Sequence, residues 1–138
     1  MERRLIYKSV AHPGLVLEDM DKILSSAYAF NTAFNVTGAL FFNGTGFLQV
    51  LEGDHHAVQT IYDSVLKDKR HTKIETVEDV AATTRIFPDW AMRLLYIPSS
   101  DGYDANWADK LPKYFSEMPE NIPAHLTDMI ENFEAVSL

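Results

Sequence analysis

The chain of 138 residues contains no cysteine, which excludes disulfide bonds and thiolate metal ligands and fits a cytoplasmic location. It also lacks any apolar run long enough to span a bilayer. Its first residues show neither the long apolar stretch nor the small-residue cleavage site of a signal peptide. Because 46% of the residues are hydrophobic, we expect a cytoplasmic protein with an ordinary globular core.

Basic residues are scarce. Twelve Lys and Arg stand against twenty Asp and Glu, which gives a formal net charge of −8. A surface that follows nucleic-acid phosphates needs a basic footprint, and anionic membranes also attract basic segments. We therefore expect neither a nucleic acid nor a membrane as a partner. The acidity can serve solubility alone.

The alternation of apolar and polar residues predicts a mixed order of strands and helices. Asn43-Gly44 is typical of a hairpin turn, and Asp54 is a good helix N-cap. Apolar residues at helical spacing mark two amphipathic helices. Strands are expected over 4–9, 36–42, 47–52, 73–81 and 90–96, and helices over 18–30 and 55–67.

This order, β-α-β-β-α-β-β, predicts an α+β fold with a ferredoxin-like sheet and both helices on one face. The strand at 47–52 is apolar on both of its faces, so both faces need cover. Two C-terminal helical segments, 104–116 and 123–135, are the expected cover for the second face. We thus divide the chain into a core, 1–97, and a linker with cap helices, 98–138.

Gln49 is the most informative residue, because it lies in an apolar strand that reads as buried. A primary amide carries two donors and an acceptor that need partners. Leaving such a group buried and unpaired costs on the order of 1–3 kcal/mol. A polar side chain or a bound ligand must therefore lie opposite Gln49.

The period of two places several candidate partners on the helix side of the sheet. Tyr7 and Gln49 face that side if their strands are oriented alike, and Trp90 and Met92 share one face of the strand at 90–96. Asn31 reaches the same space from the end of the first helix. The inward helix positions are Ile23 and Val65. Together these side chains predict a cavity that a flat aromatic ring would fill.

Several motifs in one order and at matching separations resemble the BLUF domain, a flavin-binding blue-light sensor. They cover about residues 3–96. The motifs are Leu5-Ile6-Tyr7-Lys8-Ser9, Asn31, Val36-Thr37-Gly38-Ala39-Leu40-Phe41-Phe42, Phe47-Leu48-Gln49-Val50-Leu51-Glu52-Gly53, Asp68-Lys69-Arg70-His71, Arg85-Ile86-Phe87 and Trp90-Ala91-Met92.

The resemblance implies that FAD, or FMN in its place, lies between the two helices. It also implies that Tyr7 donates an electron and a proton to the light-excited flavin. Gln49 would stand between Tyr7 and the N5 and O4 edge of the ring. Asn31 would bond the pyrimidine edge of the ring.

The resemblance assigns further roles around the ring. Asp68, Arg70 and His71 would hold the N3 and O2 side, Ile23 and Val65 would sandwich the ring, and Trp90 and Met92 would relay the state of Gln49 to the strand at 90–96. Three positions depart from the commoner family pattern. Ser64 stands where many relatives carry Arg, Phe30 where a polar residue or His is frequent, and Val65 where Ile is usual.

Duller interpretations exist for each residue: Tyr7, Trp90 and Met92 as ordinary core residues, Asn31 as a left-handed helix end, and Asp68 with Arg70 as a solvated helix end. Three other functions also remain open, namely an acylphosphatase-type enzyme, a ligand-free scaffold and a flavin oxidoreductase. The first is disfavoured because the loop at 10–14 has no Arg to bind phosphate. We expect a sensor without enzymatic activity that signals to a downstream protein and forms a homo-oligomer.

Overall fold

The computed structural model describes residues 2–97, 107, 110–113 and 117–133. Its elements follow the predicted order, with a single helix described after the last strand. They are β1 (Glu2–Ala11), α1 (Leu17–Phe34), β2 (Thr37–Phe42), β3 (Gly46–Gly53), α2 (His55–Leu66), β4 (His71–Ala82), β5 (Arg93–Tyr96) and α4 (Ala124–Asn132).

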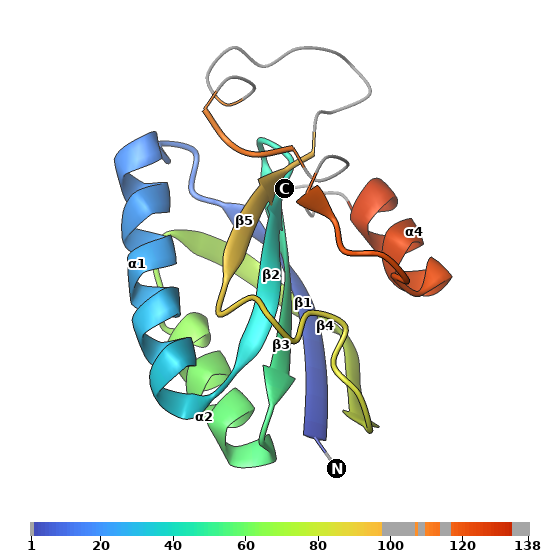
Figure 1. Ribbon diagram of the computed structural model, residues 1–138. Coiled ribbons are helices and arrows are strands. Elements are labelled where there is room, and N and C mark those ends of the chain that lie inside the picture. Colours follow the sequence, from blue (N-terminus) through green and yellow to red (C-terminus); the bar gives the residue numbers. More distant parts are fainter. Residues whose placement is uncertain (1, 98–106, 108–109, 114–116, 134–138) are drawn as a thin grey trace.

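The five strands form one sheet in the order β4-β1-β3-β2-β5. The pairs β1–β3, β1–β4 and β2–β3 are antiparallel, whereas the edge strand β5 runs parallel to β2. Helices α1 and α2 lie on one face and α4 on the other (Figure 1). The α+β, ferredoxin-like prediction is confirmed. None of the described helices combines the length and apolar character that crossing a bilayer requires.

The central strand β3 is buried along its whole length, as its two apolar faces predicted. It follows a tight turn in which the side-chain oxygen of Asn43 accepts hydrogen bonds from the backbone N–H groups of Thr45 and Gly46, at 3.0 and 2.8 Å. Such an Asx turn fixes the register of the hairpin. That hairpin pairs Gln49 with Leu40 of β2, and the separate antiparallel pairing of β1 with β3 places Gln49 directly opposite Tyr7 of β1.

Two apolar clusters cover the two faces of the sheet. On the α1 and α2 side, Leu5, Met20 and Leu51 are almost fully buried. On the α4 side, Leu126 and Ile130 pack into a cluster with residues of β1, β2 and β3. The C-terminal segment therefore supplies the expected cover for the second face.

The last strand is shorter than predicted. β5 begins at Arg93, so residues 90–92 belong to the connection before it. Because residues 90–92 do not form a strand, the side chains of Trp90 and Met92 do not lie on the same face of the sheet. Met92 packs in the cluster beneath α1 and α2, whereas Trp90 packs in the opposite cluster.

The C-terminal region also differs from its prediction. The expected helix at 104–116 lies mostly outside the described residues, and residues 110–113 form a turn and an isolated bridge from Lys113 to Tyr96. Trp107 packs edge-on against Phe42, at 5.0 Å between ring centroids, on the α1 and α2 side. The tail therefore contributes to both faces of the sheet. The second expected helix, 123–135, is present as α4.

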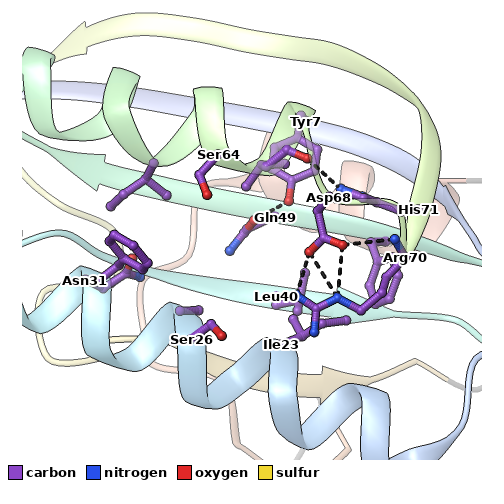
Figure 2. A pocket seen from close by; sticks show the side chains of 15 residues that line it. Tyr7, Ile23, Ser26, Asn31, Leu40, Gln49, Ser64, Asp68, Arg70 and His71 are labelled. Carbon is purple, nitrogen blue, oxygen red and sulfur yellow. Dashed lines mark hydrogen bonds and ion pairs between the residues drawn. The ribbon is translucent and has the colours of Figure 1, made fainter.

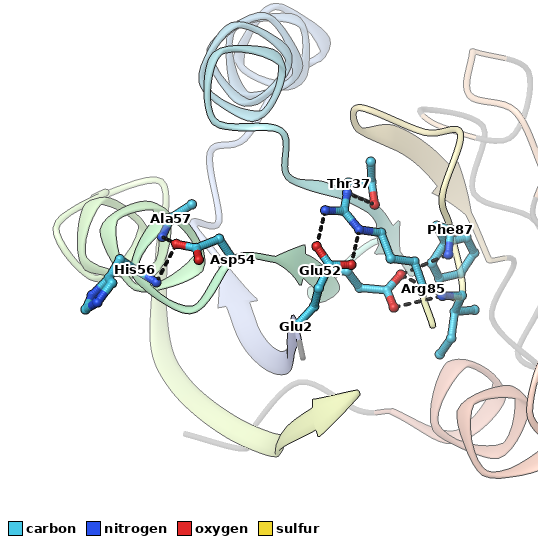
Figure 3. A network of polar contacts seen from close by, with 9 residues as sticks. Glu2, Thr37, Glu52, Asp54, His56, Ala57, Arg85 and Phe87 are labelled. Carbon is cyan, nitrogen blue, oxygen red and sulfur yellow. Dashed lines mark hydrogen bonds and ion pairs between the residues drawn. The ribbon is translucent and has the colours of Figure 1, made fainter. Parts of the chain in front are cut away.

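A buried carboxylate anchors the connection between β4 and β5 (Figure 3). Glu52, only 1% exposed, accepts hydrogen bonds from the backbone N–H groups of Ile86 and Phe87 at 2.8 Å each. Burial raises the pKa of Glu52, although these backbone donors partly oppose the rise. Arg85 closes the network by pairing with Glu2. The connection is thus attached to the end of the central strand.

Gly38→Ala should severely destabilise the protein. A Cβ at this position in β2 would lie 1.8 Å from the carbonyl oxygen of Val50, and that backbone atom cannot move without breaking the β2–β3 pairing. We expect the free energy of unfolding in urea to fall by about 3 kcal/mol or more, at the upper end of overpacking effects. Gly14→Ala is the matched control, since its Cβ would meet only His12 at 3.5 Å. Equal stability of the two variants would contradict this packing.

Candidate functional site

A cavity of about 220 Å³ lies between α1 and α2, above the centre of the sheet (Figure 2). Strands β1 and β3 form its floor and the two helices form its walls. All eight side chains predicted to contact a cofactor line it. They are Tyr7, Ile23, Asn31, Gln49, Val65, Asp68, Arg70 and His71.

Tyr7 and Gln49 meet on the floor of the cavity. The Tyr7 hydroxyl donates a hydrogen bond to Gln49 Oε1, and the two residues are 3% and 5% exposed. Burial raises the pKa of the Tyr7 phenol far above its ordinary value. Tyr7 is therefore a protonated phenol at any physiological pH, with its proton already directed at the glutamine.

The other end of the Gln49 amide contacts Met92. Gln49 Nε2 lies 3.4 Å from the Met92 sulfur, a weak acceptor. The amide therefore bridges the tyrosine of β1 and the residue just before β5. The polar group that the sequence required opposite Gln49 is Tyr7.

Asn31 is fully buried and only half satisfied. Its Nδ2 donates to the carbonyl oxygen of Ala91 at 2.6 Å, whereas its Oδ1 has no hydrogen-bond partner among the described residues. The residue lies inside the last turn of α1, and the left-handed residue that ends the helix is Asn35, with φ 54°. The interpretation of Asn31 as a left-handed helix end is therefore wrong. A buried acceptor without a donor, in the wall of a cavity, indicates a ligand that carries an N–H group.

Asp68 and Arg70 form an ion pair at the other end of the cavity from Asn31 (Figure 2). Arg70 Nη2 lies 2.7 Å from Asp68 Oδ2 and Nε lies 2.9 Å from Oδ1, and the Arg70 backbone N–H donates to Oδ1 as well. Burial would raise the pKa of Asp68, but the Arg70 hydrogen bonds outweigh it and keep this pKa low. The two charges neutralise each other within the site.

His71 bonds to the protein through both ring nitrogens. Nδ1 lies 2.7 Å from the Ser9 hydroxyl and Nε2 lies 3.1 Å from the carbonyl oxygen of Val65. A carbonyl only accepts, so Nε2 carries the proton and Nδ1 accepts from Ser9. Burial lowers the pKa of His71 and favours this neutral form. In this arrangement His71 joins β1, α2 and β4, and has no nitrogen left for a ligand.

Trp90, whose direction the sequence left open, lies outside the cavity. Its ring stacks on Phe87, at 5.2 Å and 20° between planes, and the Arg93 guanidinium lies 4.6 Å from its ring centre. The expected strand at 90–96 would have put Trp90 beside Met92. The connection at 90–92 turns it to the α4 side instead.

Other side chains that line the cavity were not predicted. Ser26 and Phe30 come from α1, and Ser64 from α2. Ser26 lies three residues after Ile23, and Phe30 lies four residues after Ser26, so helical spacing could have identified both. In the sequence, Ser64 and Phe30 stand out only as departures from the commoner family pattern.

The shape, polarity and charge of the cavity all fit a flavin ring. Aliphatic side chains of α1 and α2, Ile23 and Val65, face it from opposite sides, as a flat ring requires. The unpartnered Asn31 Oδ1 suits the N–H group on the pyrimidine edge of such a ring. No net charge faces the ring among the described residues, because Asp68 pairs with Arg70 and His71 is neutral.

Comparison with known proteins identifies the class as light sensing. The sequence model of the family described as "Sensors of blue-light using FAD", or BLUF, matches residues 3–93. The chain belongs to the BLUF family, whose members sense blue light with a flavin. The matched segment is a sensor domain, and some related proteins carry it joined to an adenylyl cyclase.

A similar sequence and a similar solved structure both support membership of this family. The blue light- and temperature-regulated antirepressor BluF of Escherichia coli (strain K12) is 37% identical over 82 residues, which span 59% of this chain and 20% of that protein. The dark-state structure of BlrB, a BLUF protein, has a TM-score of 0.67 at 29% identity and covers 69% of this chain and 72% of its own.

A third similar protein is a bacterial light-regulated adenylyl cyclase. Its structure has a TM-score of 0.68 at 35% identity, over 70% of this chain and 28% of that one. The chain spans about a fifth or less of the first curated relatives that it matches. Each of these matches therefore covers only a small part of a much longer protein.

His71→Gln should reduce the loss of stability at acid pH. The pKa of His71 lies below its ordinary value of 6.5 in the folded protein, so the unfolded chain takes up a proton first as the pH falls. The free energy of unfolding of the wild type should therefore decrease between about pH 7.5 and pH 5.5. One such group contributes at most about 1.4 kcal/mol for each pH unit.

Urea denaturation of both proteins at the two pH values measures this difference. The contributions of the other histidines are common to both proteins and cancel in the comparison. Parallel losses of stability in the wild type and the variant would contradict a buried, neutral His71.

Proposed function

We propose that this chain is a blue-light receptor in which light absorbed by a bound flavin changes the hydrogen bonding of Gln49 through Tyr7. The observation that carries the proposal is the buried chain from Tyr7 through Gln49 to Met92 in the floor of the cavity. It connects a redox-active phenol to the segment before β5 through a single amide.

We assign the cofactor as FAD, with FMN as the closest alternative. Ile23 and Val65 would lie on the two faces of the ring, and Asn31 Oδ1 would accept from its pyrimidine edge. Asp68 and Arg70 would close the opposite end. A bound flavin supplies a ring that absorbs blue light and, once excited, accepts an electron.

Tyr7 is the proposed electron donor. Its phenol would lose one electron to the excited flavin, which sharply increases its acidity. Its proton would pass to Gln49 Oε1, the atom to which it is already hydrogen-bonded, while Gln49 Nε2 releases a proton towards the flavin. A phenol with a raised pKa in a buried site does not lose its proton before the electron leaves. The two transfers are therefore coupled at this residue.

Gln49 then exchanges donor for acceptor on its amide, by rotation or by tautomerisation. If the amide rotates, its oxygen replaces Nε2 beside the Met92 sulfur, and a thioether cannot donate a hydrogen bond. The contact of 3.4 Å is then lost. Met92 must move or find another neighbour, which carries the change out of the cavity.

The output is proposed to leave through residues 90–92 and β5. Three contacts hold residues 90–92 against the rest of the site. Asn31 Nδ2 donates to the carbonyl oxygen of Ala91, Gln49 Nε2 contacts the Met92 sulfur, and the backbone N–H of Gly38 donates to the carbonyl oxygen of Trp90 at 2.9 Å. A coupling of about 1–3 kcal/mol is the usual scale for biasing a distant surface. Trp90 would report the change on the α4 side.

The receiver is proposed to be a downstream protein, bound by residues 98–138 or by β5, with the light-sensing core in residues 1–97. The similar antirepressor and light-regulated cyclase support an effector of this kind. Self-association into a homo-oligomer would present two such surfaces together.

The visible absorption spectrum, in the dark and directly after blue light, tests the proposal. A flavin spectrum that shifts slightly to the red and recovers in the dark is the expected result. A flavin that bleaches without shifting would favour an oxidoreductase. A chain that does not bind added flavin would favour an interaction scaffold.

Tyr7→Phe should bind flavin and lose the reversible red shift, because the ring is kept while the electron and proton donor is removed. Tyr62→Phe is the matched control. The Tyr62 ring lies 5.6 Å from that of Tyr7, but its hydroxyl bonds to Thr76 and it does not line the cavity. A normal shift in Tyr7→Phe, measured by light-minus-dark absorption, would remove Tyr7 from the mechanism.

Gln49→Leu should also bind flavin and give no normal red shift, since leucine fills a similar volume but cannot relay a proton or exchange hydrogen bonds. Gln59→Leu is its control, because Gln59 bonds to Arg3 and Asp63 away from the cavity. The photoproduct of each variant is measured by light-minus-dark absorption. An intact shift in Gln49→Leu would exclude the glutamine as the switch.

A further inference from the structure

We propose that Phe30 and Phe34 form a stacking platform for the adenine ring of the bound cofactor, and that this platform makes the chain prefer FAD to FMN. This inference rests on the flavin site proposed above. It concerns the half of the dinucleotide that the cavity does not enclose.

The cavity is too small for a whole dinucleotide. Its volume, about 220 Å³, lies below the roughly 300–1,000 Å³ that is usual for sites that enclose a complete ligand. A ring between Ile23 and Val65 therefore leaves the remainder of the cofactor outside. Ser26 and Ser64 project from the two facing helices at the cavity (Figure 2), and their hydroxyls suit the hydroxyls of a ribityl chain.

The charges at the cavity contribute little to the binding of the cofactor phosphates. Among the described residues that line the cavity, Arg70 is the sole permanent cation, and it is engaged by Asp68 through three side-chain hydrogen bonds. The whole chain carries a net charge of −8. A terminal phosphate therefore gains no free positive partner at the cavity. A preference for the dinucleotide must come from its adenosine half.

The two phenylalanines extend the cavity wall to the surface. Phe30 lines the cavity and is 49% exposed, and Phe34 is 44% exposed. They lie four residues apart on α1, with ring centroids 6.3 Å apart and planes within 9° of parallel. Of the large hydrophobic side chains exposed in the described part of the chain, Phe30 alone also lines the cavity.

Parallel exposed aromatic rings are a suitable surface for a nucleobase. Base stacking on an aromatic side chain tolerates any base and strengthens binding about fivefold or more. Two partly exposed phenylalanines beside a cavity also leave apolar area that a planar ring would remove from water. Adenine carries no charge, so the acidity of the chain does not oppose this contact.

The test is titration of the flavin-free full-length chain with riboflavin, FMN and FAD, followed by quenching of flavin fluorescence. We expect the wild type to bind FAD about tenfold more tightly than FMN. Phe34→Ala should reduce this ratio to near one while the affinity for riboflavin changes less than about twofold. Phe34 does not line the cavity, so this variant leaves the ring site intact.

Two further variants make the result specific. Phe30→Leu keeps an apolar wall without an aromatic face, and should lower the FAD to FMN ratio in the same direction. Tyr28→Ala is the control, because Tyr28 is 59% exposed on α1 but lines a separate groove with Leu24 and Met92. It should leave the ratio unchanged.

Equal binding of FAD and FMN by the wild type, or an unchanged ratio in Phe34→Ala and Phe30→Leu, would overturn the platform while leaving the flavin site in place. An equal drop in Tyr28→Ala would also overturn it, since the effect would not be specific to the pair. Failure of riboflavin itself to bind would instead refute the proposed flavin site. The two failures are therefore distinguishable.

Discussion

The amide of Gln49 is the interaction on which the rest of the site depends. It lies in the middle of a strand buried on both faces, where an unpaired polar group would cost on the order of 1–3 kcal/mol. The antiparallel register of β1 and β3 puts Tyr7 directly opposite, and the connection before β5 brings Met92 to its other end. The pairing that stabilises the sheet therefore also aligns Tyr7, the proposed electron donor, with the Gln49 amide and with Met92, through which the change would leave the cavity. A one-residue slip would turn Tyr7 to the α4 face and leave the amide unpaired.

A second constraint is the absence of net charge at the cavity, as far as the described residues go. Asp68 and Arg70 neutralise each other, burial keeps His71 neutral, and burial keeps Tyr7 protonated. A phosphate would find no free cation there, whereas a neutral aromatic ring with one N–H group finds two aliphatic walls and the unpartnered Asn31 oxygen. The electrostatics of the site and its shape thus select the same kind of ligand.

Much of this arrangement could be predicted from the sequence, because it depends on local patterns. The Asn43-Gly44 turn indicates the β2–β3 hairpin, and the alternation in β1 and the apolar run of β3 indicate that Tyr7 and Gln49 face the same side of the sheet. The features that could not be predicted lie in segments that do not follow a helix or strand period. No periodicity shows that strand β5 begins only at Arg93, so the sequence could not decide to which face Trp90 turns. The packing of Trp107 on Phe42 was missed as well, because it is a long-range contact that no local sequence pattern indicates.

Isotope-edited infrared spectroscopy of the flavin-loaded chain tests the central claim most directly. The sequence contains two glutamines, so a chain carrying Gln59→Glu and side-chain-labelled glutamine reports on Gln49 alone. Light-minus-dark spectra should contain bands that move with the label and disappear during dark recovery. A normal red shift with no label-sensitive band would show that the amide of Gln49 stays unchanged in the light, and the account would be wrong.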